Sequence, residues 1–276
     1  RRARRELLLG ARLGARVERN PRGEEGEAPS RSRCHNGTVS PRRVSVVLFD
    51  GFELLDVFGP VELFGMVPGK VDVEFVGPQA GAVASGQGAQ AIATSGYAAA
   101  APADIVLVPG GRGTRRLVAD GRFLSWLRGW AGSASLVTSV CTGSALLAAA
   151  GLLDGYDATS NKRAFDWVRT HGEDVRWIRR ARWVEDRDRW TSSGVAAGMD
   201  MAVALLGRLF GDAVAREAAS RAELDVHGDP SWDPFAQTAD PPPPGRTGDS
   251  PAEPADGSGL PARPATGARA TSHPGF

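Results

Sequence analysis

The chain has 276 residues, and its 33 Lys and Arg nearly balance its 32 Asp and Glu. The balance hides an asymmetry, because residues 1–43 hold twelve basic and five acidic groups, which leaves 21 basic and 27 acidic groups for residues 44–276. A mildly acidic main part argues against a nucleic-acid partner. No apolar run reaches the roughly 18 residues that a spanning helix needs, which argues against a membrane partner.

The two ends of the chain differ in composition from its middle. Residues 1–42 form an Arg-rich leader without a strong hydrophobic period, and residues 236–276 contain nine of the 19 prolines. Such segments bury too little apolar surface to offset the entropy of ordering. We therefore expect a disordered or spurious leader with a true start near Val39, one domain over residues 43–235, and a disordered Pro-rich tail.

The first half of this domain alternates between strand and helix patterns. A nearly continuous apolar run predicts a strand over residues 43–49 that is buried on both faces. The next expected elements are a helix over 54–65, a strand over 71–76, a hairpin within 82–97 and a buried strand over 105–108.

The second half continues the alternation. The expected elements are a helical stretch through 123–130, a strand over 136–140, a helix over 145–150, a short strand over 157–160, a short helix over 164–170, a hairpin from 182–184 and 190–192, and helices over 195–210 and 212–224. This order predicts an α/β fold, with a mostly parallel sheet and helices on both faces. Ligands of such sheets bind at the carboxyl ends of the strands.

The strongest chemical signal is Ser-Val-Cys-Thr-Gly-Ser over residues 139–144, between a predicted strand and a predicted helix. A sharp strand-to-helix turn lifts its central side chain, Cys141, out of the sheet, as in a nucleophile elbow. The start of the following helix favours a thiolate, the reactive form of cysteine. The alternative is a buried structural cysteine, since Cys also packs as a small hydrophobic residue. Position alone favours neither.

A second signal is the pair Gly110 and Gly111, which ends the neighbouring strand. Two glycines permit close backbone approach and unusual dihedral angles. Together with the backbone N–H of Thr142, they could form an oxyanion pocket beside Cys141. The alternative is an ordinary turn between a strand and a helix.

Asp56 lies near the start of the first predicted helix. The simpler interpretation is a helix N-cap, because Asp is favoured at that position. The functional interpretation places its carboxyl at the same sheet edge as Cys141, where partial desolvation would raise its pKa and make it a general acid. From the residues alone the cap is favoured.

Other reactive side chains are sparse. His35 and His273 lie in the chain ends and His171 closes a predicted helix, so only His227 stays a candidate for the Cys–His pair that commonly activates a thiol. No cluster has metal-ligand spacing and no Gly-rich loop fits a phosphate, so we expect neither a metal nor a cofactor. Two cysteines provide no disulfide framework, which favours a reducing, cytoplasmic location.

Four segments, in order, resemble the ThiJ/PfpI superfamily, whose fold is the flavodoxin-like fold of class I glutamine amidotransferases. They are Phe-Asp-Gly-Phe-Glu-Leu-Leu-Asp-Val-Phe-Gly-Pro over 49–60, Val-Pro-Gly-Gly over 108–111, Val-Thr-Ser-Val-Cys-Thr-Gly-Ser over 137–144, and Trp-Thr-Ser-Ser-Gly-Val-Ala-Ala-Gly-Met-Asp over 190–200. The Leu-Asp-x-x-Gly-Pro and Thr-Ser-Val-Cys-Thr-Gly-Ser forms most resemble the isonitrile hydratase branch.

The resemblance implies roles for three positions. Cys141 corresponds to the nucleophile, Asp56 to the acidic residue beside it, and Thr142 to the adjacent pocket threonine. The resemblance therefore favours a general acid over a helix cap as the role of Asp56. In the implied hydro-lyase reaction the thiolate attacks the terminal carbon of R–N≡C, Asp56 handles the proton, water adds, and an N-substituted formamide leaves. The resemblance thus implies a small-molecule substrate, and also a homodimer.

One departure from the resemblance concerns Asn161. Hydratase-like relatives commonly have Thr-Thr-His-Trp after the short strand, whereas this chain has Thr-Ser-Asn-Lys over residues 159–162. Asn161 cannot act as a base, but its amide can hydrogen-bond in the pocket. The change disfavours protease-like acyl transfer and leaves the exact substrate open.

Two other functions stay open. One is a glyoxalase- or deglycase-like enzyme of the same superfamily. The other is a non-catalytic ligand or redox sensor, since an exposed Cys141 thiol of low pKa also suits oxidation. AraC-type regulators carry a similar domain fused to a helix-turn-helix, but the Pro-rich chain after residue 235 disfavours that fusion here.

Overall fold

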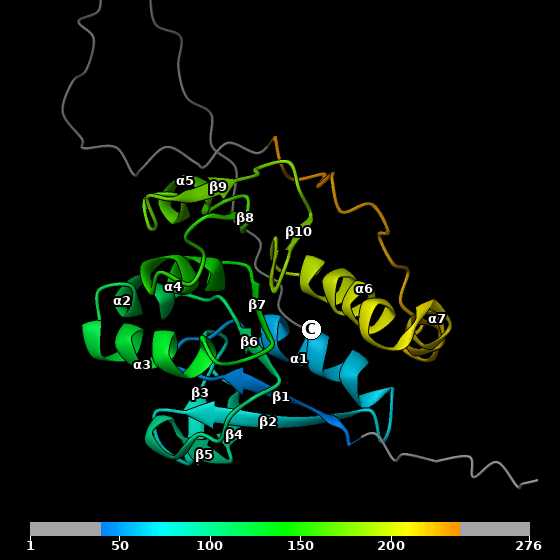
Figure 1. Ribbon diagram of the computed structural model, residues 1–276, viewed down its shortest axis with the longest axis horizontal. Helices are drawn as coiled ribbons and strands as arrows, with labels where there is room; N and C mark the ends of the chain where they lie inside the picture. Colours follow the sequence, from blue (N-terminus) through cyan, green and yellow to red (C-terminus); the bar gives the residue numbers. More distant parts are fainter. Residues whose placement is uncertain (1–39, 238–276) are drawn as a thin grey trace, which may run out of the picture. The chain divides into compact units, whose positions relative to one another are not determined.

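A seven-stranded sheet forms the centre of residues 40–237, the part of the chain that the computed structural model describes (Figure 1). Its parallel strands are β1 (Arg42–Val47), β2 (Val71–Gly77), β5 (Ser95–Gly96), β6 (Ile105–Val108), β7 (Leu136–Val140) and β11 (Arg189–Ser192). The strand β10 (Trp183–Asp186) pairs antiparallel with β11 at one edge. The predictions for residues 1–39 and 238–276 lie outside the described residues.

The central strands owe their place to their composition. Every residue of β6 and β7 is buried, as are the last four residues of β1, and most of these residues are aliphatic or β-branched. A strand without a polar face needs cover on both sides, which is the environment of a parallel sheet between helices.

Helices provide that cover on both faces (Figure 1). The helices α1 (Leu54–Gly65), α6 (Ala197–Phe210) and α7 (Asp212–Arg221) pack against one another on one face. The opposite face carries α2 (Thr114–Leu117), α3 (Gly121–Ala131) and α4 (Gly143–Ala149). The predicted α/β fold with a mostly parallel sheet is therefore confirmed. Within residues 40–237, no helix has the length and apolar character needed to cross a membrane.

Some details differ from the sequence-based expectation. The predicted helical stretch over 123–130 lies within α3, whose first turn is capped by the Asp120 side chain, which accepts hydrogen bonds from the backbone N–H groups of Arg122 (3.0 Å) and Phe123 (3.1 Å). The short helix α2 before it was not predicted. The smaller elements are the hairpin β3 (Gly81–Ala84) and β4 (Gln90–Ala93), the 3-10 turn η1 (Tyr97–Ala99), and the pair β8 (Tyr156–Ala158) and β9 (Val175–Trp177) with α5 (Phe165–Val168) between them. Strand β9 was not predicted.

The order of the strands locates the functional edge of the sheet. Numbered along the chain, the parallel strands β2, β1, β6, β7 and β11 follow the order 2-1-3-4-5, the flavodoxin-like order. The connections change direction between β1 and β6, which opens a crevice at the carboxyl ends of these strands. Asp56 follows β1, Gly110 follows β6, and Cys141 follows β7 directly, so all three reach this one edge.

Candidate active site

Cys141 lies at a strained turn between β7 and α4. Its φ of +57° falls in the left-handed region, which costs a non-glycine residue roughly 1–2 kcal/mol. The backbone is held from both sides. Its N–H donates to the carbonyl oxygens of Ser192 (3.1 Å) and Ser193 (3.3 Å), and its own carbonyl accepts from the hydroxyls of Ser160 (2.8 Å) and Ser144 (3.2 Å). A strained backbone that several hydrogen bonds hold in place is typical of functional positions.

Asp56 is fully buried and does not cap its helix, so the N-cap interpretation is wrong. Helix α1 begins at Leu54, two residues earlier, and the free N–H of Leu54 donates instead to the side-chain oxygen of Gln87 (3.1 Å). The Asp56 carboxyl points into the site, where Oδ2 accepts a hydrogen bond from the N–H of Gly110 (2.9 Å). Its Oδ1 makes no hydrogen bond of ordinary geometry within residues 40–237.

Burial makes Asp56 a proton carrier. Desolvation raises the pKa of Asp56 to about 8, and the Gly110 N–H, the largest opposing influence, lowers it only in part. The negative charge of Glu53 raises the pKa further, while a hydrogen bond with Cys141 lowers it. The carboxyl therefore holds its proton at neutral pH, which is the state that a general acid requires.

The Cys141 thiol differs from the exposed, low-pKa thiol that the redox alternative requires. It is buried, with 6% of the residue exposed, and this burial raises the pKa of Cys141 well above its ordinary value. A charged Asp56 raises the pKa further, whereas hydrogen bonds from the Thr142 backbone and the Asn161 side chain lower it. A protonated Asp56 has no negative charge to repel the thiolate. The two groups therefore titrate as a pair, and the Cys141 thiolate forms most readily while Asp56 is neutral.

The two glycines hold the site together through their amides. The N–H of Gly110 is taken by Asp56, and the N–H of Gly111 donates to the hydroxyl oxygen of Thr142 (3.1 Å). A Cβ on Gly110 would lie 2.6 Å from the Thr142 nitrogen and 2.8 Å from Asp56 Oδ2, so only glycine fits. Both amides thus position Asp56 and Thr142, which leaves the Thr142 N–H as the backbone donor that faces the sulfur of Cys141.

Asn161 and a residue without a predicted role complete the surroundings of the sulfur. Asn161 Oδ1 accepts hydrogen bonds from the backbone N–H groups of Arg163 (3.0 Å) and Ala164 (3.2 Å), which leaves its NH₂ group to donate to the thiol. A Cβ on Gly194 would lie 2.5 Å from that NH₂ nitrogen and 2.7 Å from Cys141 Sγ. A side chain at position 194 would collide with the sulfur, so glycine allows the backbone to pack directly against it. Its only sequence signal is its place after a predicted strand within the Ser-Ser-Gly of the fourth motif.

Residues 42–208 match the DJ-1/PfpI family. The chain belongs to this family.

The relatives of this DJ-1/PfpI chain differ in what they do. Isonitrile hydratase of Pseudomonas putida is 35% identical over 169 residues, which are 61% of this chain and 72% of that protein. The HTH-type transcriptional regulator GbdR of Pseudomonas aeruginosa is 32% identical over 177 residues, 62% of this chain and 48% of the regulator. The chain thus spans about half the length of the regulator. The crystal structure of a ThiJ/PfpI family protein from Pseudomonas syringae superposes with a TM-score of 0.63 at 27% identity, covering 82% of this chain and 87% of the other.

The two histidines within residues 40–237, His171 and His227, pack against tryptophans. The ring of His171 packs against Trp167, and the ring of His227 stacks on Trp232 at 6.0 Å between centroids. No histidine is among the groups that shift the pKa of Cys141. In the described part of the chain, no cluster of three or more His, Cys, Asp or Glu could hold a metal ion.

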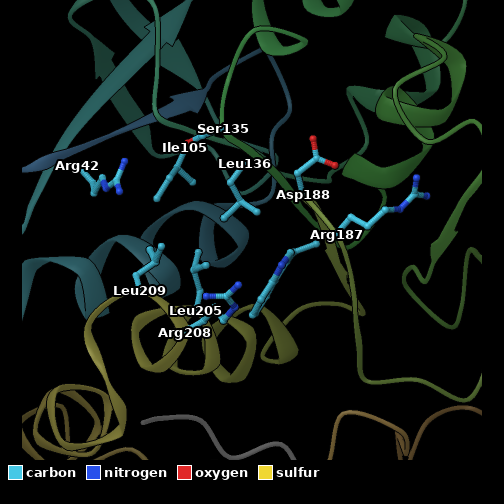
Figure 2. A pocket seen from close by; sticks show the side chains of 10 residues that line it. Arg42, Ile105, Ser135, Leu136, Arg187, Asp188, Leu205, Arg208 and Leu209 are labelled. Atoms are coloured by element: carbon cyan, nitrogen blue, oxygen red, sulfur yellow. The ribbon is translucent and has the colours of Figure 1, made fainter.

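A cavity of about 250 Å³ lies at the opposite edge of the sheet, where the parallel strands begin (Figure 2). Figure 2 shows side chains from these strand starts and from the end of α6 around it. The arginines in its lining pair with acidic residues, as in the pairs Arg42–Asp104 (3.9 Å) and Arg208–Glu185 (3.6 Å). None of the predicted site residues lines this cavity.

Proposed function

We propose that this DJ-1/PfpI protein is a cysteine-dependent enzyme that hydrates small isonitriles to N-substituted formamides. The observation that carries the proposal is the enclosure of one sulfur, Cys141 Sγ, between a buried acid, Asp56, and an amide donor, Asn161. A nucleophile beside a group that holds a proton at neutral pH is the minimum that such an addition needs. The similarity to isonitrile hydratase supports the choice of substrate class.

The reaction balances from the pair that holds a single proton, in which Cys141 is a thiolate and Asp56 carries the proton. The Cys141 thiolate forms an S–C bond to the terminal carbon of R–N≡C while Asp56 gives its proton to that carbon, which yields a thioimidate, R–N=CH–S. Water then adds across the C=N bond, with OH going to carbon and H to nitrogen. The S–C bond breaks, the thiolate leaves, and the hydroxyl proton returns to Asp56 as the formamide forms. The Thr142 N–H and the Asn161 amide stabilise the thiolate at both ends of the cycle.

The second candidate is a non-catalytic ligand- or redox-sensing protein. Similarity to the regulator GbdR favours it, because a relative with this domain acts in transcription. The mildly acidic composition of residues 44–276 supports the proposal that this chain itself has no nucleic-acid partner. A third possibility is glyoxal chemistry at the same thiol, as in a glyoxalase- or deglycase-like enzyme.

The full chain offers its own matched control for a direct assay, since Cys34 is its other cysteine. Purified protein is incubated with a simple alkyl isocyanide, and the N-substituted formamide is quantified by mass spectrometry. We expect product from the wild type and from Cys34→Ala, and none from Cys141→Ala. Product from folded Cys141→Ala contradicts the mechanism.

The absence of product from the wild type contradicts the proposed substrate class. Glyoxals are then assayed as substrates of the same protein. Sulfinic acid formation at Cys141 after peroxide treatment, without turnover of either substrate, or binding of the full chain to DNA favours the sensing role.

We also propose that a second copy of the chain is its protein partner. Leu55 and Phe58 are three residues apart on α1, so they are neighbours on its surface, with 42% and 38% of each residue exposed. Sedimentation of the wild type at twice the chain mass, and of Phe58→Ser at a larger monomer fraction, is the expected result. A monomeric wild type contradicts this proposal and leaves the chemistry of the thiol untouched.

A further inference from the structure

Lys162 is a buried lysine that directly follows Asn161 in the chain. It is one of only two lysines in the chain, and 2% of it is exposed. Its ammonium group donates to the hydroxyl of Thr159 (2.8 Å) and to the carbonyl oxygens of Ser160 (3.2 Å) and Ala181 (2.5 Å). An ammonium has three N–H donors, so all of them are used.

Burying a charge is costly unless it is both hydrogen-bonded and paired. Desolvation lowers the pKa of Lys162 to about 8, and the negative charge of Asp233 opposes that change, while Arg179 and Arg182 add to it. Asp233 comes from the segment after α7 and is 1% exposed, with Oδ2 lying 4.0 Å from the guanidinium of Arg182. Arg182 in turn is held by Asp200, with 2.7 Å between its Nε and Asp200 Oδ2. The lysine therefore belongs to a buried cluster of charges rather than to an apolar core.

The segment that Lys162 holds is the one that contacts Cys141. Within residues 159–161, the hydroxyl of Ser160 donates to the Cys141 carbonyl (2.8 Å), and the side chain of Asn161 hydrogen-bonds to the thiol. Two of the three acceptors of the ammonium, on Thr159 and Ser160, lie in this same segment. The third, on Ala181, lies in the chain that leads into β10 and so anchors the segment to the sheet.

We propose that Lys162 is a positioning residue, whose ammonium ties residues 159–161 to Ala181 and thereby holds the Asn161 amide against the Cys141 sulfur. Asp233 supplies the facing negative charge from the segment after α7. The inference rests on the proposed function only in that Cys141 is the reactive group, and it concerns the reactivity of the thiol rather than the identity of the substrate.

The test measures alkylation of Cys141 by iodoacetamide as a function of pH, in a Cys34→Ala background so that only one thiol reacts. We expect Lys162→Met to be alkylated about 10-fold more slowly near neutral pH, with the midpoint of its pH profile raised by about one unit, since one unit of pKa is a factor of ten in thiolate at fixed pH. The matched control is Arg163→Met, which removes a positive charge from an exposed neighbour and is expected to stay within about twofold of the background protein.

A double-mutant cycle separates positioning from mere structural support. Asn161→Ala removes the donor itself, so adding Lys162→Met to it is expected to change the profile little further. A structural role alone predicts a lower melting temperature with an unchanged midpoint, or additive effects in the cycle, and either result overturns the proposal.

Asp233→Asn provides a second route if Lys162→Met does not fold. It removes the negative charge that favours the charged ammonium, so it is expected to weaken the hold of Lys162 on residues 159–161 and to shift the midpoint in the same direction by less. An unchanged midpoint overturns the proposal. Because alkylation needs no isonitrile, a failure of the hydratase assay leaves this result readable.

Discussion

The two edges of the sheet differ in the features that make a site reactive. The edge where the strands end holds buried groups of raised pKa, Asp56 and Cys141, and a left-handed turn at the nucleophile position. The edge where the strands begin holds a cavity of about 250 Å³ whose arginines pair with exposed acids. A cavity offers room, whereas reactivity needs desolvated titratable groups with donors and acceptors still available. The difference teaches that a cavity by itself does not mark the reactive edge of the sheet.

Ion pairs at the two edges also differ in environment. The side chain of Arg208 is 70% exposed and that of Glu185 46%, so water screens their attraction. The side chains of Arg182 and Asp200, behind the thiol, are 9% and 5% exposed. Removing one partner of a buried pair leaves an uncompensated charge, whereas removing one partner at the surface leaves a solvated one. Breaking an ion pair should therefore cost more stability at the carboxyl edge than at the amino edge.

The largest expected effect is on folding and comes from Gly143→Ala at the carboxyl edge. A Cβ there would lie 2.1 Å from the carbonyl oxygen of Val108 and 2.8 Å from that of Pro109, both backbone atoms that cannot move away cheaply. We expect a loss of at least about 3 kcal/mol, at the upper end of overpacking costs, measured by urea unfolding. The matched control is Gly129→Ala on α3, which meets nothing within 4 Å and should stabilise by roughly 0.5–1 kcal/mol through helix propensity. Equal effects of the two would contradict the close packing at this edge.

Leu205→Ala at the amino edge should destabilise the fold without touching the chemistry. Leu205 lines the cavity of Figure 2 and is 1% exposed, so its truncation is expected to cost roughly 2–5 kcal/mol in urea unfolding. Below the unfolding transition, the pH midpoint of Cys141 alkylation should equal that of the wild type. A shifted midpoint would mean that the two edges are coupled.

Asp56→Asn should change the pH dependence of the stability more than the stability itself. The pKa of Asp56 is raised from 3.8 to about 8, so between these values the folded state holds a proton that the unfolded state lacks. Wild-type stability should accordingly fall as pH rises from about 4 to 8, by up to about 1.4 kcal/mol per pH unit from this group, and the fall should be shallower in Asp56→Asn. Urea unfolding at pH 5 and pH 8 measures the difference.

Two further results sharpen the Asp56 prediction. Formamide production should be lost in Asp56→Asn, because an amide has no proton to give at neutral pH. Parallel stability profiles of the wild type and the variant would show that Asp56 is ionised in the folded protein, against the protonated acid argued above.

The smallest expected effect is that of Arg208→Ala. The exposed pair with Glu185 contributes at most about 0.5 kcal/mol, and alkylation of Cys141 should be unchanged. Thermal unfolding at low and high salt measures the contribution. A loss well above 1 kcal/mol would show that the charges around the cavity act as a network rather than as separate surface pairs.

The sequence by itself determined the fold class and the edge on which the site lies. Aliphatic runs such as 105–108 and 136–140 predict strands buried on both faces, and a cysteine directly after the second run must emerge at its carboxyl end. These inferences succeed because hydrophobic period and strand-to-helix order are properties of neighbouring residues. The boundaries of helices and strands could also be predicted where the local sequence marks them, whereas no local signal marks the short strand β9.

Only the tertiary structure decided what the side chains do at that edge. Judged from its neighbours in the sequence, Asp56 is a good helix cap. Its carboxyl instead points into the site, where it accepts a hydrogen bond from the Gly110 amide, 54 positions away in the chain. The thiol, which the redox interpretation requires to be exposed, is buried, because β11, Asn161 and Gly194 pack around it. Lys162 carries no local signal, since its partners include Ala181 and the distant Asp233. The physical reason is that desolvation, charge pairing and hydrogen-bond partners depend on residues that meet only when the chain has folded.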